Sequence, residues 1–330
     1  MKYNIQSKIL LIAALVAAAP AVWAKPVLEL PAFIYDGRRF DARAAGMGDA
    51  FVSVADNPSA AYWNPAGIKL LGRNYFFACM DMMNKTDASK ADLYANDSLE
   101  DRRILGLGLA AKEGAFTFMP LTDYSRIFNN REINLKVNKY TMSAASESSQ
   151  NMLVGVTISY LSGNIGVVDM NNLSAKVSGG NGAALDWGLL YKMNDNVRIG
   201  FDAQNAPGYI WWDEYEHQHL KPRIQTGFSV RSTQWFMLAV EYENKNVDFK
   251  RKDFYHAGME QNILGSIFIR EGVILEKLSD TKSKKNIYTY GIGYAFTTGF
   301  TADVSAKIYK LGNAADDTAD DYLFSLNLPF

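Results

Sequence analysis

The sequence predicts an all-β fold: an antiparallel transmembrane β-barrel of about 14 strands, with a small N-terminal helical hatch in its lumen. Three observations predict this class. The chain begins with a secretory signal, its strand-like segments are joined by links that are short and long in turn, and it ends on an alternating strand with a terminal aromatic residue. Outer-membrane barrels have short periplasmic turns and longer outward loops, whereas a soluble sandwich has no reason to sort its loops by end.

Residues 1–24 have the features of a cleaved signal peptide. Lys2 and Lys8 give a charged start, residues 9–19 an apolar run, and residues 22–24 a cleavage site with small residues. The apolar run is shorter than the roughly 20 residues that a spanning helix needs. The mature chain has no long apolar run, so a membrane location requires a barrel. We therefore expect export to the outer membrane of a Gram-negative-type bacterium.

Residues 25–72 differ from the barrel that we assign to 73–330. The stretch 41–50 is rich in glycine and alanine, and in 56–58 and 64–65 a capping side chain comes before a proline, which favours short helical turns. A compact piece of this kind suits a plug in the lumen, and a periplasmic lid is the alternative. The residues assigned to the hatch are Arg43, Gly46, Met47, Gly48, Asp56, Asn57, Pro58, Asn64, Pro65, Ala66 and Gly67.

The barrel region divides into strand-like runs separated by turns and loops. The expected strands are 75–80, 103–110, 114–121, 135–145, 151–161, 183–191, 197–204, 222–231, 234–243, 253–260, 264–271, 287–296, 299–309 and 321–330. The expected long links are 81–102, 122–134, 162–182, 205–221, 244–252, 272–286 and 310–320. With the C-terminus in the periplasm, every long link lies outside the cell.

Apolar and polar residues alternate along these strands. In 197–204, Val197, Ile199 and Phe201 face away from Arg198 and Asp202. In a membrane barrel the apolar set faces lipid and the polar set faces the lumen. We expect Glu260 and His256 to pair with Arg270, in a network that props the barrel open or shut. The lumen network comprises Arg198, Asp202, Arg223, His256, Glu260 and Arg270.

The last ten residues alternate up to a terminal aromatic side chain. The residues of this terminal strand signal are Tyr322, Phe324, Leu326, Leu328 and Phe330. The pattern is similar to the signal by which the barrel-assembly machinery recognises outer-membrane barrels for insertion into lipid. The alternative is a final edge strand of a soluble β domain, in which Pro329 is tolerated near the strand end.

Other function classes receive little support from the sequence. The formal net charge of −1, which becomes −3 when the two signal-peptide lysines are removed, gives no electrostatic case for nucleic acid. A single cysteine, Cys79, excludes an internal disulfide framework. We find no catalytic triad, phosphate loop or Cys/His cluster, and we expect neither an enzyme nor a cofactor. A metal at 216–219 is disfavoured because no third ligand is fixed by spacing. Trp211-Trp212 are expected in the interfacial girdle.

One long motif resembles a known family. Residues 43–52 read Arg-Ala-Ala-Gly-Met-Gly-Asp-Ala-Phe-Val, and 55–68 read Ala-Asp-Asn-Pro-Ser-Ala-Ala-Tyr-Trp-Asn-Pro-Ala-Gly-Ile. This is similar to the N-terminal signature of the FadL superfamily, and within it the chain most resembles the PorV/PorQ branch. The resemblance implies a 14-strand barrel with an N-terminal hatch, whose Asn-Pro-Ala falls on Asn64, Pro65 and Ala66.

Two functions follow from the resemblance. The first is a PorV-like, non-enzymatic partner of a type IX-like protein-secretion machine, which binds cargo or another barrel. The alternative is FadL-like passive transport of small hydrophobic molecules past the hatch and sideways through a kinked wall. A water-filled general porin is a weaker option, because a hatch blocks the lumen.

Overall fold

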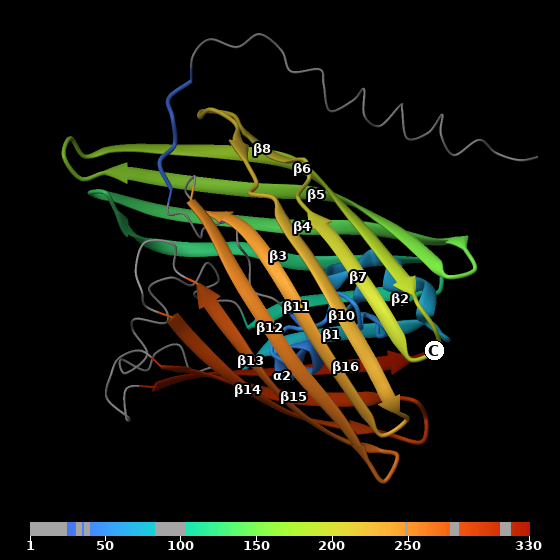
Figure 1. Ribbon diagram of the computed structural model, residues 1–330. Helices are drawn as coiled ribbons and strands as arrows, with labels where there is room; N and C mark the ends of the chain where they lie inside the picture. Colours follow the sequence, from blue (N-terminus) through green and yellow to red (C-terminus); the bar gives the residue numbers. More distant parts are fainter. Residues whose placement is uncertain are drawn as a thin grey trace, which may run out of the picture.

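The computed structural model describes residues 25–30, 35, 40–82, 103–247, 250–277, 284–310 and 318–330. They form a closed 14-strand antiparallel barrel, which confirms the expected fold class. Figure 1 shows how the wall strands surround the N-terminal helices. The ring closes through the pairing of the first wall strand with the last. The expected signal peptide lies outside the described residues. No helix in the described ranges is long and apolar enough to cross a membrane.

Fourteen of the sixteen labelled strands make up the wall. They are β1 (Tyr75–Asp81), β2 (Ile104–Ala111), β3 (Gly114–Phe128), β4 (Arg131–Ser149), β5 (Met152–Asp169), β6 (Ser174–Lys192), β7 (Val197–Gln204), β10 (Arg223–Thr233), β11 (Phe236–Val247), β12 (Lys250–Ile263), β13 (Ile267–Lys277), β14 (Lys284–Ala295), β15 (Thr301–Lys310) and β16 (Thr318–Pro329). The two short strands β8 (Gly208–Trp212) and β9 (Gln218–His219) form a hairpin on the outer part of β6.

The prediction of two outward loops was wrong. Residues 122–134 and 162–182 are mostly strand, because β3 to β6 continue far past the lengths that we expected. Between β3 and β4 only Asn129 and Asn130 remain, with φ of 49° and 58°. Positive φ at both central residues is typical of the tight type I′ hairpin turn, which asparagine tolerates.

These extensions reverse the usual faces of a membrane strand. On the outer part of β4, Ile133, Leu135 and Val137 are fully buried on the lumen side, while Glu132 and Lys136 are exposed. Apolar side chains of a membrane strand face outward where lipid surrounds it. On the outer part of β4 the apolar set faces the lumen and the polar set faces outward, the reverse of a lipid-facing strand.

A smaller error concerns the turn between β12 and β13. We expected it at 261–263, but β12 runs to Ile263 and the turn follows it. Leu264 and Gly265 adopt φ of 56° and 79°, the left-handed region in which glycine is favoured. The expected strand at 264–271 therefore begins three residues later, at Ile267.

Aromatic side chains lie side by side on several wall strands. Phe118, Tyr140 and Tyr160 form a row across β3 to β5, with ring centroids 5.3 and 6.3 Å apart. On the β8 hairpin, Tyr209 stacks on the exposed Trp211, whereas Trp212 turns inward and is buried. The expected girdle role therefore fits Trp211 and not Trp212.

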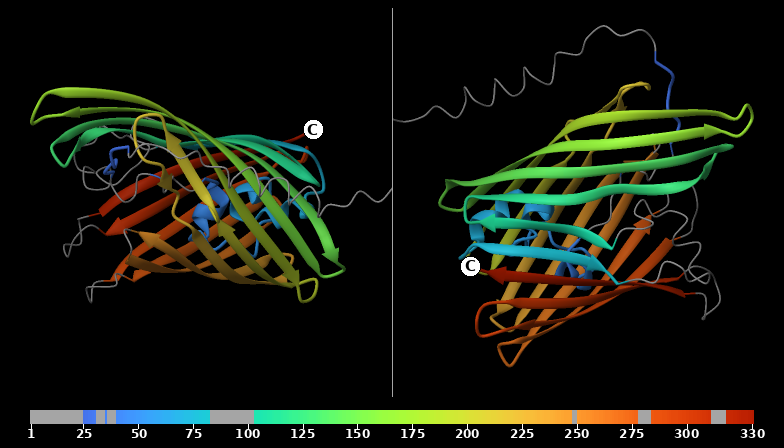
Figure 2. Two further views of the ribbon diagram at one scale, coloured as in Figure 1. Left: turned by 90° about the horizontal axis from the view of Figure 1, so that it is seen from above. Right: turned by 180° about the vertical axis from the view of Figure 1, so that it is seen from behind.

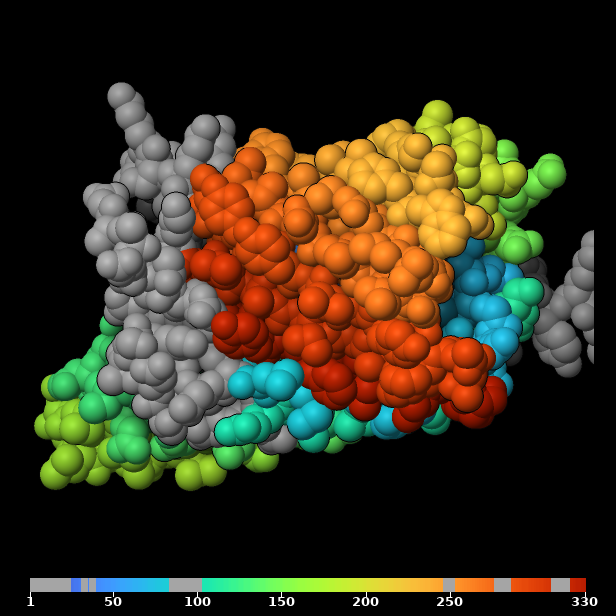
Figure 3. Space-filling view, turned by 90° about the horizontal axis from the view of Figure 1, so that it is seen from below, coloured from blue at the N-terminus to red at the C-terminus, as the bar shows by residue number. Residues whose placement is uncertain are grey.

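The C-terminal strand closes the ring. β16 pairs with β15 on one side and with β1 on the other, where Leu328 lies opposite Phe76. Leu328 and Phe330 are exposed on the outer face. Figure 3 shows the orange and red C-terminal strands as a continuous surface. Part of the blue N-terminal segment is visible at the end that carries the short turns. The role of this strand as an insertion signal stays a prediction.

The outward face of β10 provides a test of the membrane assignment. Phe228 is exposed between Ile199 and Val240 on the neighbouring strands. We expect Phe228→Arg to destabilise the inserted barrel by about 2–4 kcal/mol, because a charge there must enter lipid. The folded fraction in lipid bilayers, recorded over a range of urea concentrations, measures this loss of stability. As a control, Thr301→Arg places the same charge in a cavity of the lumen. Equal yields for the two variants would show that the outer face is not in lipid.

Candidate functional site

A segment of the N-terminal region lies inside the barrel. We call residues 40–71 the inner segment, and it contains α2 (Ala42–Gly46), α3 (Ala60–Trp63) and η1 (Pro65–Leu70). Most of its residues are buried, and its helices contact β3 to β6 and β13 to β16. Figure 2 shows it enclosed by wall strands in two further views.

Polar side chains fix the local shape of this segment. Asn64 accepts a hydrogen bond from the N–H of Ala66 at 3.1 Å, and Pro65 occupies the first turn of η1. The amide of Asn64 also donates to the carbonyl oxygens of Val52 and of Leu189 on β6, at 2.8 and 3.0 Å. Asn64 therefore caps a helical turn, and it ties two parts of the inner segment to the wall.

A second buried hub is Asp41, which we did not assign to the site from the sequence. Its carboxylate caps α2 by accepting from the N–H of Arg43 at 2.9 Å. It also accepts from the side chains of Asn57, at 2.6 Å, and of Ser59. On the wall, Ser325 of β16 donates to it at 3.2 Å. This carboxylate holds the two halves of the inner segment together.

The backbone of the inner segment touches the wall at glycines. A Cβ on Gly258 would lie 2.1 Å from the carbonyl oxygen of Met47, and a Cβ on Gly200 would lie 2.3 Å from that of Val52. No other residue permits such an approach. The backbone of the inner segment approaches five wall glycines in this way, and side chains of Asn64, Pro65 and Val52 approach two more. We name all seven the glycine seats, and they are Gly155, Gly188, Gly200, Gly227, Gly258, Gly272 and Gly291.

Glycines of the inner segment itself complete the fit. A Cβ on Gly46 would lie 3.0 Å from the Cα of Gly291, so glycine faces glycine there. Gly48 has φ of 65° and lies against Ala257 and Val273 of the wall, and Gly67 packs on the carbonyl oxygen of Ala55. These three positions belong to the hatch residues that the sequence assigned.

Wall side chains bind the backbone between the seats. Glu241 of β11 accepts hydrogen bonds from the N–H groups of Phe51 and Val52, at 2.9 and 2.8 Å. Thr289 of β14 donates to the carbonyl oxygen of Gly46 at 3.0 Å. Lys307 of β15 donates to the carboxylate of Asp49 at 2.7 Å. Because these groups are buried, each bond is costly to break.

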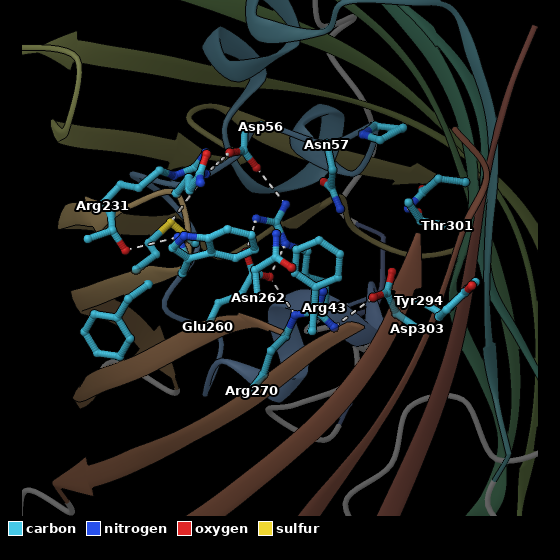
Figure 4. Close-up of a pocket in the computed structure, with 18 of the residues that line it drawn as sticks. Arg43, Asp56, Asn57, Arg231, Glu260, Asn262, Arg270, Tyr294, Thr301 and Asp303 are labelled. Atoms are coloured by element: carbon cyan, nitrogen blue, oxygen red, sulfur yellow. Dashed lines mark hydrogen bonds and ion pairs between the residues drawn. The ribbon is translucent and has the colours of Figure 1, made fainter. Parts of the chain in front are cut away.

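A chain of ion pairs joins the inner segment to the wall at the end with the short turns (Figure 4). Asp56 lies 2.7 Å from Arg43 and 3.1 Å from Arg231. Glu260 receives bonds from Arg43 and Arg270, both at 2.7 Å. We name this set the latch, and it consists of Arg43, Asp56, Arg198, Arg231, Glu260, Arg270 and Asp303.

The charge on Asp56 depends on its arginine neighbours. Burial raises the pKa of this carboxyl, but Arg43, Arg198 and Arg231 outweigh burial and lower the pKa to about 2. Arg198 lies 3.7 Å away on β7 and also donates to the carbonyl oxygen of Val54. Asp56 therefore stays ionised at neutral pH, and it links the inner segment to β7 and β10.

The expected lumen network separates into two clusters. Glu260 and Arg270 pair as expected, but His256 does not join them. Its ring lies 2.8 Å from the carbonyl oxygen of Gly48 and 3.2 Å from Glu243, which in turn pairs with Arg223 at 3.0 Å. Glu243 is the nearer acid because it lies on β11, the strand adjacent to β12.

Three further residues from the sequence analysis lie apart from these clusters. Asp202 is fully buried opposite Gln225, and neither carboxylate oxygen accepts a hydrogen bond from a described residue. His217 and His219 have ring centroids 5.4 Å apart on the exposed β8–β9 hairpin. The described part of the chain contains no group of three or more His, Cys, Asp or Glu that could hold a metal.

The two ends of the lumen differ in character. At the end with the short turns, a cavity of about 370 Å³ is lined by latch residues and by Pro58, Asn57 and Asn262. At the outer end, apolar side chains of the extended strands form a cluster that Leu28 and Trp212 cover. The strand residues of this outer apolar lining are Ile133, Leu135, Val137, Leu161, Ile165 and Val167.

Sequence reasoning missed several functional positions. Arg231 and Asp303 have the alternation of lumen-facing residues, but nothing in the sequence shows that they reach Arg43 or Asp56. The glycine seats were not singled out from the sequence. Their signal is that Gly200 lies opposite Gly227, and Gly258 opposite Gly272, on adjacent strands. Such pairs weaken a sheet unless another backbone approaches it.

Comparisons with known proteins place the fold among FadL-type barrels. No protein-family model and no curated protein matches the chain. The toluene transporter TbuX of Ralstonia pickettii aligns with a TM-score of 0.60 and 12% identity, over 90% of this chain and 100% of that chain. The monoaromatic hydrocarbon channel CymD gives 0.62 and 12%, over 90% and 98%. A FadL homologue of Pseudomonas aeruginosa gives 0.56 and 11%, over 92% and 99%. The chain therefore has the fold of FadL-type outer-membrane transporters.

The glycine seats lead to a prediction about the inner segment. We expect Gly258→Val to displace residues 46–48, because overpacking against backbone costs about 1–3 kcal/mol and nothing nearby is flexible. The barrel should still form, with the inner segment newly open to protease. Gly166→Val is the matched control, since a Cβ there has its nearest neighbour at 4.0 Å. Equal protection of the two variants would contradict the close packing.

The latch leads to a prediction about pH. Because the pKa of Asp56 is lowered, its charge stabilises the seated segment above the unfolded carboxyl pKa of about 3.9, and this is lost as pH falls to about 2. Ion conductance in planar bilayers should rise as pH falls from about 4 to about 2, because Asp56 then loses its charge. Asp56→Asn should raise conductance at pH 7, and Asp195→Asn on an exposed turn should not. Equal conductance of Asp56→Asn and wild type at pH 7 would contradict this assignment.

Proposed function

We propose that this protein is a passive outer-membrane channel for small hydrophobic molecules, with the inner segment as its hatch. The observation that carries the proposal is the outer apolar lining. Ile133, Leu135 and Val137 are buried on the lumen side of β4, in the outer part of the wall. A channel for ions or sugars has a polar interior, whereas an apolar lining favours solutes that leave water readily.

The seated inner segment supports a channel that excludes water. Glycine seats on seven wall positions and the buried bonds of Glu241 and Lys307 close the lumen below the outer lining. A solute that passes the lining therefore meets a polar, tightly bonded block. An apolar molecule gains nothing by crossing the latch, because buried charges offer it no favourable contact.

A sideways route fits the geometry of β3. The ladder between β2 and β3 runs from Ala111–Gly114 to Leu107–Phe118, whereas the β3–β4 ladder runs along all of β3. Just beyond Phe118, where the β2–β3 ladder ends, the register of the β3–β4 ladder shifts between Pro120 and Thr122. Proline has no N–H to donate, and a bulge bends a strand. We propose that solutes leave the lumen into lipid beside Pro120.

The names of the structural neighbours agree with this proposal. TbuX is described as a toluene transporter and CymD as a monoaromatic hydrocarbon channel. Their identity to this chain is 12%, so the solute here is inferred from the lining alone. The PorV-like secretion role rests on the resemblance of the N-terminal motif, and we found no feature of the described residues that favours it.

Uptake into liposomes tests the proposal. We expect Leu135→Asn to slow naphthalene uptake by about tenfold, since an amide without a partner costs about 1–3 kcal/mol on an apolar path. Lys136→Gln is the matched control, because the adjacent side chain is exposed on the outer face. Heat-modifiable migration on a gel shows that both variants fold.

Two results would contradict the channel. One is that the wild-type protein does not speed naphthalene uptake over empty liposomes. The other is that Leu135→Asn and Lys136→Gln behave alike. If surface display of secreted proteins then falls in cells that carry Leu135→Asn, the secretion role replaces the channel.

A further inference from the structure

The cavity at the short-turn end has the size of a ligand site. Its volume of about 370 Å³ lies within the range of small-molecule pockets, which is about 300–1,000 Å³. Its floor is the inner segment, with Arg43, Asp56 and Asn57, and its sides are the ends of wall strands (Figure 4). It lies on the opposite side of the inner segment from the outer apolar lining. A molecule would therefore reach it from the periplasm.

Arginines are concentrated beside this cavity. Three guanidinium groups and three carboxylates line it, and a fourth guanidinium, that of Arg198, lies 3.7 Å from Asp56 outside the lining. Asp56 serves three of the arginines, Arg43, Arg198 and Arg231. An arginine that shares its acid with two others has donors left for a further anion.

Arg231 is the latch residue best placed to bind one. Its side chain is 42% exposed, against 22% for Arg198, 13% for Arg43 and 2% for Arg270. Its Nη2 donates to Asp56 at 3.1 Å, while its Nη1 and Nε have no acceptor among the described residues. Both edges by which a guanidinium binds a carboxylate through two bonds, Nη1 with Nη2 and Nε with Nη2, include the Nη2 that donates to Asp56, so a bound carboxylate shares this nitrogen with Asp56.

The remaining lining indicates what the carboxylate is attached to. Tyr75, Met237 and Phe268 contribute aromatic and apolar surface, and Trp235 lies at the rim. Asn262 has a buried Oδ1 that accepts no hydrogen bond from a described residue, so water or a donor on a ligand would satisfy it. Aromatic walls bind flat ring systems, and inorganic anions gain nothing from them.

We propose that this cavity is a periplasmic site for small aromatic carboxylates, with Arg231 as the residue that recognises the carboxylate. The site goes beyond the proposed channel function, since it lies behind the hatch and takes charged molecules. A bound carboxylate competes with Asp56 for Arg231. Binding therefore weakens one of the contacts between the inner segment and β10.

Calorimetric titration of the full mature protein in nanodiscs tests this site, with sodium 2-naphthoate as the probe. We expect saturable binding to the wild type, at least tenfold weaker binding to Arg231→Gln, and wild-type binding to Arg73→Gln. Arg73 is an exposed arginine at the same end of the barrel and does not line the cavity. Uncharged naphthalene should displace naphthoate at least tenfold less well than benzoate does.

Three results would overturn the proposal. They are the absence of saturable naphthoate binding to the wild type, equal affinity of Arg231→Gln and Arg73→Gln, and equal competition by naphthalene and benzoate. Heat-modifiable migration of Arg231→Gln establishes that a loss is not a failure to fold. The uptake measurements on Leu135 concern the other side of the inner segment, so the two proposals can fail independently.

Discussion

The close approach of the inner segment's backbone to the barrel wall is the constraint on which the rest of this structure depends. Five of the seven glycine seats allow it, and a Cβ at Gly258 or Gly200 would overlap a carbonyl oxygen of the inner segment. The polar groups buried at this contact must then bond across it, as Glu241 does with two N–H groups. The position of the inner segment is thus a property of the wall as much as of the segment itself.

This contact divides the lumen into two environments that the chain treats differently. On the outer side the strands are long and turn apolar residues inward, where Leu135 and Leu161 pack. On the periplasmic side the latch joins α2 and the following turns directly to three wall strands, β7, β10 and β12, through charged side chains. Asp56 connects to β7 and β10, and Arg43 connects to β12 through Glu260. Breaking one partner of such a pair leaves a buried charge uncompensated, so the latch favours a single seated arrangement.

The sequence predicts the wall strands well because the alternation of apolar and polar residues is a local pattern. Alternation in β7 and β10 places Arg198 and Gln225 inward and Phe201 and Phe228 outward, and the structure agrees. The alternation of a lipid-facing strand holds only where lipid lies outside, so we expected loops at 122–134 and 162–182. Asn129-Asn130 is nevertheless a local signal of a tight hairpin. Contacts between distant residues were beyond local reasoning. His256 pairs with Glu243 instead of Glu260, and Arg231 reaches Asp56 across 175 positions of sequence. The hatch motif drew attention to Asn64 and Asp56, but their partners on the wall became visible only in the fold.

The central claim is that the inner segment closes a lumen whose outer half accepts hydrophobic solutes. Deleting residues 41–68 and recording ion conductance and naphthalene uptake of the same reconstituted protein tests it most directly. The account predicts that the deletion opens a large ion conductance which the full chain lacks, because the glycine seats and the latch acids then face water. It predicts also that naphthalene uptake keeps its dependence on Leu135, because the outer apolar lining precedes the inner segment on the path. A folded deletion protein with the same low conductance as the full chain would contradict the account.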